Sequence, residues 1–512
     1  MSSIQMATNP AWDDDDEILS RVAEGDEVPL SYAQEQMWFL QSLEPGLTAY
    51  NLPRTFRLRG PIDADALERA FQALVERHAI LRTRFFERDG VALQTVQAKA
   101  DFKLECVDLS QHTGQERTAA LDALVHRTTQ HVFDLGTAPA LVARLARLGN
   151  DEHVLTVCLH HIVSDAWSNP ILAGDLGAAY EQALRTPGAV HLPPLRVQYA
   201  DYALWQRERV HADDLARQLY YWNKHLGDEV PVLDLPTDAE RPARQTFSGA
   251  LHGFALDTEL AIALQKFCRA EKCTPFVVLL AAWQMVLGRF SGQNDFAIGV
   301  PNAGRHRDEV RDLMGFFITT QVFRARLAPG RTLREICRQV RADAMSALQH
   351  ADLPFEVLLA SRKVHRDAAR SPLFQVMFGV QMADGSVDVA FDGTRAELVA
   401  AEHSTAKFEL SLDFQIDAQG AYAQLEYNTD LFAPATAVRL AKSYMQLLEM
   451  LTTQPDRLFA SVDLSDHAQR AQLAAWGTNA LSYDGGEPVH ALIGRQVALR
   501  ADAPALVYGE ES

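Results

Sequence analysis

Helical and strand-like patterns alternate along most of this chain, and the alternation runs twice. In the first half, apolar residues recur at three- and four-residue spacing from residue 62, which predicts a helix, before the strand-like LRTRFF and a buried strand over 154–159. In the second half, predicted helices over 257–270 and 275–290 precede a predicted strand over 296–300. At 512 residues the chain is too long for one core, and the Pro- and Asp-rich VPVLDLPTDAERPARQTFSG separates the halves. The pattern predicts an α/β sandwich with two lobes of similar size.

Composition argues against several partners. A net charge of −19, from 48 Lys and Arg against 67 Asp and Glu, disfavours binding to nucleic acid or to an anionic membrane. No apolar run approaches the roughly 18 residues of a membrane span, and the N-terminus lacks a secretory pattern. The five cysteines form no CxxC pair, so we expect reduced thiols in a cytoplasmic protein, with no disulfide frame or zinc site.

The two ends of the sequence differ from the middle in composition and pattern. Residues 1–27 are polar and acidic, and we expect a disordered leader with a short helix near 18–23, the alternative being a docking segment for an upstream protein. After residue 460 the pattern changes again. The strand-like run at 504–508 has no partner before the sequence stops, which indicates the start of a further domain.

The stretch LHHIVSDAWS, residues 159–168, is the strongest candidate site. Adjacent strand residues point to opposite faces, so His160 and His161 diverge, and no third Cys or His ligand stands nearby, which disfavours a metal. A neutral imidazole can take or share a proton near neutral pH. Asp165 can orient a histidine or hold the loop by pairing with an arginine. From this stretch alone, a catalytic role and a polar turn with two satisfied histidines both remain open.

The spacing HHxxxD followed by AWS resembles the active-site motif of the condensation domains of nonribosomal peptide synthetases. Six further regions resemble the other motifs of that family, in the same order. They are SYAQEQMWFL (31–40), ERHAILRTRF (76–85), YADYALWQ (199–206), GVPNAGR (299–305) with MGFFITTQVFRARL (314–327), HADLPFEVLL (350–359) and RDAARSPLFQVMF (366–378). The resemblance covers about residues 28–460, and the ordered series makes coincidence a poor explanation.

The resemblance implies a fold and a domain order. We expect two lobes like chloramphenicol acetyltransferase, residues 28–210 and 211–460, in a V arrangement with a central tunnel. Residues 461–488 resemble a linker, and 489–512 the truncated start of an adenylation domain. The implied partners are a donor and an acceptor thioester on phosphopantetheine of carrier proteins, or a donor on coenzyme A. We expect a monomer with no covalently bound cofactor and no metal.

By the same resemblance, the motif residues take distinct roles. His161 is the catalytic residue: it accepts a hydrogen bond from the acceptor's α-amine or removes its proton. His160 packs beside it. Asp165 is mainly structural and pairs with an arginine from the other lobe, for which Arg305 is the match.

Two further motif positions bear on activity and subtype. Ala166 stands where the family usually has glycine, which costs about 1 kcal/mol if φ is positive and nothing if φ is negative. Trp167 precedes Ser168, an order that favours condensation over epimerisation, and the histidines exclude a cyclisation domain, which has aspartates there.

Seven other positions are candidates for lining the tunnel or contacting substrate, each with a plain packing alternative. Phe317, Thr319 and Gln321 lie where the family bridges its lobes over the tunnel. Ser31 opens the first motif, and Ser371 stands beside Pro372 on the expected acceptor side. Arg144 and Arg147 precede the histidine strand and are candidates for limiting acyl length.

The donor is the open part of the functional hypothesis. Because the sequence begins with Met1 and a short leader that lacks a clear docking pattern, we expect a starter domain. Such a domain N-acylates the first aminoacyl thioester from acyl-CoA or an acyl carrier protein. The alternative is an ordinary L-donor domain that elongates a peptide. An alternative of another class is a catalytically silent platform that recruits other enzymes.

Overall fold

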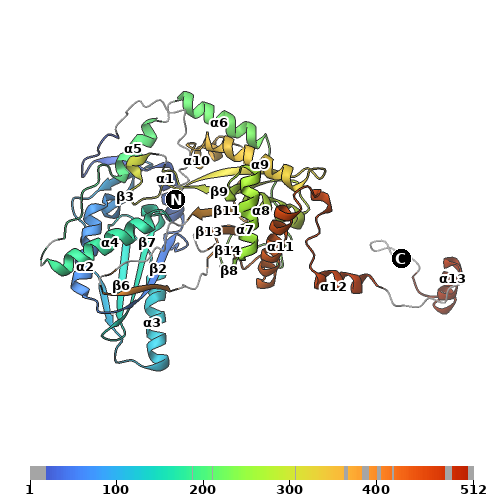
Figure 1. Ribbon diagram of the computed structural model, residues 1–512, viewed down its shortest axis with the longest axis horizontal. Coiled ribbons are helices and arrows are strands. Elements are labelled where there is room, and N and C mark those ends of the chain that lie inside the picture. The colour runs from blue at the N-terminus through green and yellow to red at the C-terminus, as the bar shows by residue number, and fades with distance from the viewer. Residues whose placement is uncertain are drawn as a thin grey trace. The chain divides into compact units, whose positions relative to one another are not determined.

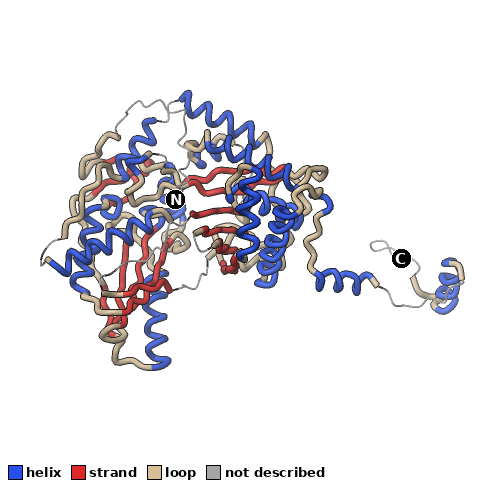
Figure 2. Tube along the Cα trace, viewed as in Figure 1, coloured by secondary structure: helices blue, strands red, loops and turns tan. Residues whose placement is uncertain are grey.

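A computed structural model describes residues 19–186, 188, 190–209, 212–305, 307–362, 367–382, 391, 393–399, 405–417, 420–478 and 487–504. The acidic run at 13–17 and all but the first residue of the run at 504–508 lie outside these ranges. The chain divides into two compact units, Met1–Val462 and Asp463–Ser512. Figure 2 shows that the strands of the first unit form groups flanked by helices. The predicted mixed α/β class is confirmed.

The first lobe is built on a five-stranded sheet with the order β12-β2-β7-β6-β5 (Figure 1). Its strands are β2 (Asn51–Arg59), β5 (Glu105–Asp108), β6 (Leu141–Arg147), β7 (Glu152–His160) and β12 (Arg395–Val399). Helices α2 (Ala64–Arg77) and α4 (Ser168–Arg185) share the large core of this lobe with the sheet. Helix α3 (Gly114–Thr129) packs against β2, β6 and β7. Strand β7 is central and buried along nearly its whole length, as its apolar run predicts.

The second lobe is built on a six-stranded sheet with the order β10-β9-β11-β13-β14-β8. Its strands are β8 (Gly249–Ala255), β9 (Asp295–Asn302), β10 (Thr319–Arg326), β11 (Val376–Met382), β13 (Leu410–Ile416) and β14 (Ala421–Asn428). The helices that pack with it include α7 (Thr258–Glu271), α8 (Pro275–Ser291), α9 (Leu333–Leu348) and α11 (Pro434–Thr453). Helix α8 is buried from Val277 to Gly288, because it is apolar on every face and lies between α7, α9 and α11.

Two segments from the second half of the chain contribute to the first lobe. Strand β12 pairs antiparallel with β2 at the edge of the five-stranded sheet. The connection between β9 and β10 buries Val310, Leu313, Met314 and Phe317 in the core of the first lobe. The sequence division at 210/211 misses these crossings, because local patterns do not show which sheet a strand joins. Near that division, α5 (Tyr199–Arg209) packs on β1 (Glu27–Pro29) of the first lobe and α6 (Ala212–Leu226) on β10 of the second.

The end of the expected leader is part of the first lobe. Leu19 is 3% exposed and belongs to the large core, and the backbone N–H of Val22 donates to the Asp201 carboxylate at 2.7 Å. Strand β1 (Glu27–Pro29) pairs with β4 (Val91–Val96), which also pairs with β3 (Thr83–Arg88). The helix expected near 18–23 is wrong for its described residues, 19–23, which form neither helix nor strand because tertiary partners take their side chains and hydrogen bonds.

The second unit is described over 463–478 and 487–504. It contains α12 (His467–Gly477), which falls in the expected linker, and α13 (Val489–Leu499). Neither helix has a buried residue. In the described part of the chain no single helix has the length and apolar character to cross a membrane. Helices α7 and α8, which are bent by 105° relative to each other, meet that criterion only when they are taken together, and only by length and composition.

Candidate active site

The histidine motif forms the connection from β7 to α4. His160 ends the strand, and its Nδ1 accepts a hydrogen bond from the N–H of Ile162 at 3.1 Å, which caps the short 3-10 turn His161–Val163. The N–H of His161 donates to the carbonyl of Tyr50 at 2.9 Å, and the N–H of Ser164 donates to the carbonyl of His161 at 3.2 Å. The backbone around His161 is therefore fixed from both sides.

The His161 side chain has a defined tautomer. Its Nδ1 lies 2.8 Å from the carbonyl oxygen of Ser164. Because a carbonyl can only accept, Nδ1 carries the proton and Nε2 keeps its lone pair. The ring also packs against Phe316, with centroids 4.7 Å apart. His161 therefore offers a single, oriented hydrogen-bond acceptor at Nε2.

The charge state of His161 is set by its surroundings. Burial and the positive charge of Lys407 lower the pKa of His161 to about 3. The imidazole is therefore neutral at physiological pH, with Nε2 free to accept a hydrogen bond. The same low pKa makes it a weak base.

Lys407 is a residue that the sequence analysis missed. Its ammonium lies 5.0 Å from the centre of the Tyr50 ring, and Tyr50 is also the residue whose carbonyl binds His161. The Lys407 charge lowers the pKa of both histidines of the motif. A lysine directly before FELSLDF, at 408–414, whose apolar and polar residues alternate as in a strand, was the available signal, because a charge seldom stands next to a buried strand without a partner.

His160 lies in a packed environment. It is 1% exposed, its ring meets the edge of Phe133 at 5.9 Å, and burial lowers its pKa to about 4. Its Nε2 has no hydrogen-bond partner among the described residues. The described residues also contain no group of three or more His, Cys, Asp or Glu arranged to hold a metal ion.

Asp165 and Arg305, which the sequence analysis pairs, are in contact. Asp165 is fully buried and accepts from the Arg305 guanidinium at 3.1 and 3.4 Å. The carboxylate also accepts from the N–H and hydroxyl of Ser168 and from the N–H of Phe317. It therefore joins the start of α4 to the crossing connection from the second half of the chain.

Arg305 is held by more than this ion pair. It lies in the connection after β9, and its Nη1 donates to the carbonyls of Val310 at 2.7 Å and Leu313 at 2.6 Å. The guanidinium also lies 4.0 Å from the centre of the Phe317 ring. Among the described buried atoms, its Nε has no partner. These contacts hold the connection between β9 and β10 folded back on itself, next to the histidine motif.

Ala166 is in an exposed turn, and its backbone is not strained. The non-glycine residues with positive φ in the described chain are Asp89, Phe247, Lys272 and Leu373, and Ala166 is not among them. The alanine in the usual glycine position therefore carries no left-handed penalty. The neighbouring Trp167 is 45% exposed, and its indole N–H donates to the carbonyl of Arg311 at 3.1 Å.

We predict that Ala166→Gly does not raise activity and lowers the free energy of unfolding by about 0.5–1 kcal/mol. The reason is that glycine gains freedom in the unfolded chain and removes no strain from the folded one. Urea denaturation with parallel rate measurements checks this, with Ala173→Gly in α4 as a control for a helical site. A more stable Ala166→Gly variant would contradict it.

The candidates near the lobe crossing differ in their contacts. Phe317 is 3% exposed and packs on Arg305 and Tyr199. The Thr319 hydroxyl is buried with no partner among the described residues, whereas Gln321 donates to the carbonyl of Ala347 at 3.3 Å. The structure therefore brings Phe317 to the Asp165–Arg305 pair, and it places Thr319 and Gln321 at the start of β10.

The remaining candidates occupy structural positions. Ser31 is the N-cap of α1 (Tyr32–Leu43), is 1% exposed, and bonds the Tyr199 hydroxyl at 2.9 Å. The carbonyl of Ser371 accepts from Gln375, and its side chain lines a small cavity beside the Arg241–Glu409 ion pair. Arg144 pairs with Glu105 and Arg147 with Asp108, both on β5. None of their described contacts reaches His161.

Comparisons with known proteins converge on one family. Residues 24–474 match the family model described as the condensation domain. One component of the linear gramicidin synthase of Brevibacillus parabrevis is 40% identical over 487 residues, which are 95% of this chain and 9% of that protein. The chain thus spans less than a tenth of that relative's length. Enniatin synthase of Fusarium equiseti is 35% identical over 440 residues, which are 85% of this chain and 14% of that protein.

Two solved structures have a similar fold. The X-domain in a complex with OxyB from teicoplanin biosynthesis matches with a TM-score of 0.79 and 26% identity, over 88% of this chain and 98% of that one. The condensation domain from the Monacolin K polyketide synthase MokA matches with a TM-score of 0.73 and 24% identity, over 86% of this chain and all of that one, 100%.

Proposed function

The chain belongs to the condensation-domain family of nonribosomal peptide synthetases, whose members form amide bonds as acyltransferases, and from that premise we propose that it joins an acyl thioester to the α-amine of an aminoacyl thioester. One observation carries the proposal. The neutral His161 presents Nε2 as a hydrogen-bond acceptor, because Nδ1 is bonded to the Ser164 carbonyl. An α-amine needs such an acceptor when it attacks a carbonyl carbon.

In the proposed reaction, His161 positions the nucleophile. The amine nitrogen attacks the donor's thioester carbon, the C–S bond breaks, and the thiol of the carrier leaves with the proton that the nitrogen gives up. A free α-amine, with a pKa of roughly 8, is already nucleophilic at neutral pH. The weakly basic imidazole therefore contributes mainly by holding the amine in line and by stabilising its developing positive charge.

For the donor, we propose an acyl group on coenzyme A or on an acyl carrier protein, so that the chain N-acylates the first residue of a peptide. The alternative is a peptidyl donor on an upstream carrier protein. The acceptor in both cases is an aminoacyl phosphopantetheine thioester on a downstream carrier protein. The two donors differ in the group that must enter the space beside His161, an acyl chain or a peptide, so an experiment can distinguish them.

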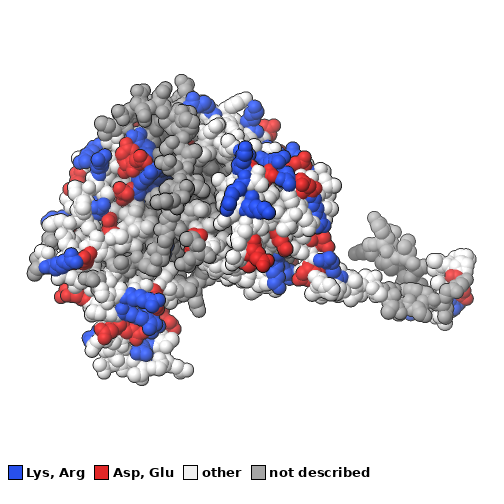
Figure 3. Space-filling model, in the orientation of Figure 1, with Lys and Arg blue, Asp and Glu red and all other residues white. Residues whose placement is uncertain are grey.

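We further propose the context in which the chain works. It acts in the cytoplasm as a monomer, with two lobes around a substrate tunnel that are formed mainly by residues 28–210 and 211–460 and share the crossing segments described above. Residues 461–488 serve as a linker, and 489–512 as the start of an adenylation domain. The overall negative charge supports the absence of nucleic-acid and membrane partners. In Figure 3 acidic and basic side chains are interspersed on the visible face, which is consistent with this.

A recruitment platform is the second candidate. The observation in its favour is the fold similarity to an X-domain that was solved in complex with OxyB. The oriented Nε2 of His161 favours catalysis, because a silent platform has no need of a fixed tautomer beside Lys407.

The test is product formation by the full chain. We expect the chain, incubated with an aminoacyl carrier protein and acyl-CoA, to give an N-acyl-aminoacyl carrier protein by mass spectrometry. The controls are the carrier protein without phosphopantetheine and the His161→Asn variant. Product from a peptidyl carrier donor alone would contradict the starter role. No product from any donor, together with tight binding of a tailoring enzyme, would contradict catalysis.

A further inference from the structure

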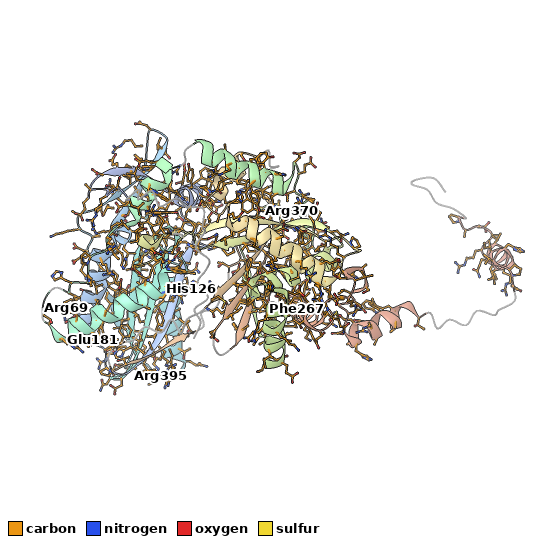
Figure 4. All side chains as sticks on the ribbon, turned by 45° about the horizontal axis from the view of Figure 1, so that its top comes forward. Arg69, His126, Glu181, Phe267, Arg370 and Arg395 are labelled. Carbon is orange, nitrogen blue, oxygen red and sulfur yellow. The ribbon has the colours of Figure 1, made fainter. Side chains whose placement is uncertain are left out.

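Three of the five cysteines lie together at the end of α7, outside the histidine motif. Cys268 is in the last turn of that helix, beside Phe267, which Figure 4 labels. Cys273 follows the helix, and Cys337 comes from α9. Two arginines of α9, Arg338 and Arg341, donate to Glu271 at the end of α7 at 2.9 and 3.2 Å, which brings α9 beside this helix end. Cys273 is partly exposed, whereas the other two are buried.

The helix end itself brings Cys268 and Cys273 into contact. Lys272 is left-handed, with φ 51° and ψ 47°, and the N–H of Cys273 donates to the carbonyl of Cys268 at 3.0 Å. This is the pattern of a Schellman motif, in which the side chains at the two ends of that hydrogen bond pack together. The proximity of these two thiols therefore follows from the helix cap.

The charges around Cys273 favour its thiolate. The thiols of Cys268 and Cys337 and the guanidinium of Arg341, which donates to the carbonyl of Glu271 at 3.2 Å, all act to lower the pKa of Cys273. The first turn of α8 begins directly after Thr274, which gives no side-chain cap, so its free N–H groups add positive potential. Glu271, the carboxylate two positions before Cys273 in the chain, is paired with Arg334 and Arg338. Together these groups hold the pKa of Cys273 far below its ordinary value.

Cys106 provides the contrast within the same chain. It is exposed, yet burial and the carboxylates of Glu68 and Asp65 raise its pKa. Cys158 is fully buried, and burial raises its pKa to about 12. Cys273 is therefore the cysteine of this chain that combines access with a stabilised thiolate, and it has a second thiol in contact.

We propose that Cys273 is an oxidative modification site, at which hydrogen peroxide forms a sulfenic acid that Cys268 resolves to a reversible disulfide. In the first step the thiolate attacks peroxide, an S–O bond forms, the O–O bond breaks, and hydroxide leaves. In the second step the Cys268 sulfur attacks the Cys273 sulfur, an S–S bond forms, the S–O bond breaks, and hydroxide leaves with the Cys268 proton as water. Peroxide is reduced and two thiols are oxidised. A thiol reductant restores the pair.

The first test needs no substitution. The folded chain is treated with limiting iodoacetamide at slightly acid pH, and labelled peptides are quantified by mass spectrometry. We expect Cys273 to react at least about tenfold faster than the more exposed Cys106, because only the thiolate attacks. Equal or slower labelling of Cys273 would overturn the proposal. Since the readout is alkylation, it is independent of any condensation activity.

The second test follows the disulfide. With hydrogen peroxide, we expect the wild-type chain to form the Cys268–Cys273 bond, which disappears on addition of a reductant. The double variant Cys268→Ala with Cys337→Ala should instead accumulate a sulfenic acid on Cys273 that dimedone traps, whereas Cys106→Ala and Cys337→Ala alone should still form the bond. A disulfide between Cys273 and Cys337 in the wild-type chain would overturn the assignment of Cys268. Absence of any oxidation at Cys273 would overturn the site.

Discussion

His161→Ala is expected to lower the rate of amide formation by about 10²–10⁴-fold, the range observed when a positioned proton acceptor is removed. The Nε2 lone pair disappears with the ring, and no other described side chain is placed to replace it at this turn. The fold should survive, because the loss is one hydrogen bond to the Ser164 carbonyl, worth about 1 kcal/mol, and a contact with Phe316. Single-turnover assays and thermal unfolding measure the two effects separately.

Two amide variants separate the two functions of the imidazole, which are the donor at Nδ1 and the acceptor at Nε2. His161→Asn retains a donor to the Ser164 carbonyl and loses the acceptor at the Nε2 position. His161→Gln loses that donor and can place an oxygen acceptor near the Nε2 position. If the Nε2 acceptor drives the reaction, Gln retains more activity than Asn. The opposite order would assign the effect to the anchored backbone turn.

The pH dependence gives an independent check on His161. Because its pKa is lowered to about 3, it stays neutral across the assay range and contributes no inflection. The wild-type rate should therefore rise with pH through the pKa of the acceptor amine, roughly 8, and then level off. A second inflection near the ordinary histidine pKa of about 6.5 would show that His161 titrates as a general base.

The sequence predicted the fold class and the site with uneven success, for physical reasons. The apolar run of β7 and the amphipathic pattern of α2 are local signals, so both elements lie where the periodicity indicates. The motif spacing also predicted that Asp165 and Arg305 are partners, although 140 positions separate them. This second prediction depended on family resemblance, because no local pattern encodes a contact across two lobes.

Features set by tertiary contacts escaped sequence reasoning. Residues 19–23 carry a helical composition, yet a hydrogen bond from Val22 to Asp201 and the burial of Leu19 hold them in an irregular conformation. Strand β12 joins the sheet of the first lobe from far along the chain. Lys407 affects both histidines of the motif although it lies just before β13 of the second lobe, and its distance from the motif in sequence concealed it.

Asp165→Ala is expected to lower the free energy of unfolding by about 3–5 kcal/mol, the cost of leaving one partner of a buried ion pair without its counter-charge. The Arg305 side chain is 1% exposed, and without Asp165 it keeps the neutral carbonyls of Val310 and Leu313 and the Ser168 hydroxyl as acceptors, with no counter-charge. Denaturant unfolding measures the change. Glu152→Gln is the matched control, because its ion pair with Arg57 is substantially exposed and should be worth less than about 1 kcal/mol.

Replacing Arg305 should lower the free energy of unfolding less than replacing Asp165 does, so the two residues can be tested as a pair. In Arg305→Met, the Asp165 carboxylate keeps the N–H and hydroxyl of Ser168 and the N–H of Phe317 as donors, so its charge remains solvated by the protein. The double variant Asp165→Ala with Arg305→Met should be more stable than Asp165→Ala alone, because it removes the unpaired guanidinium. An Asp165→Ala chain that is as stable as the wild type but inactive would contradict the structural role and assign Asp165 to the chemistry.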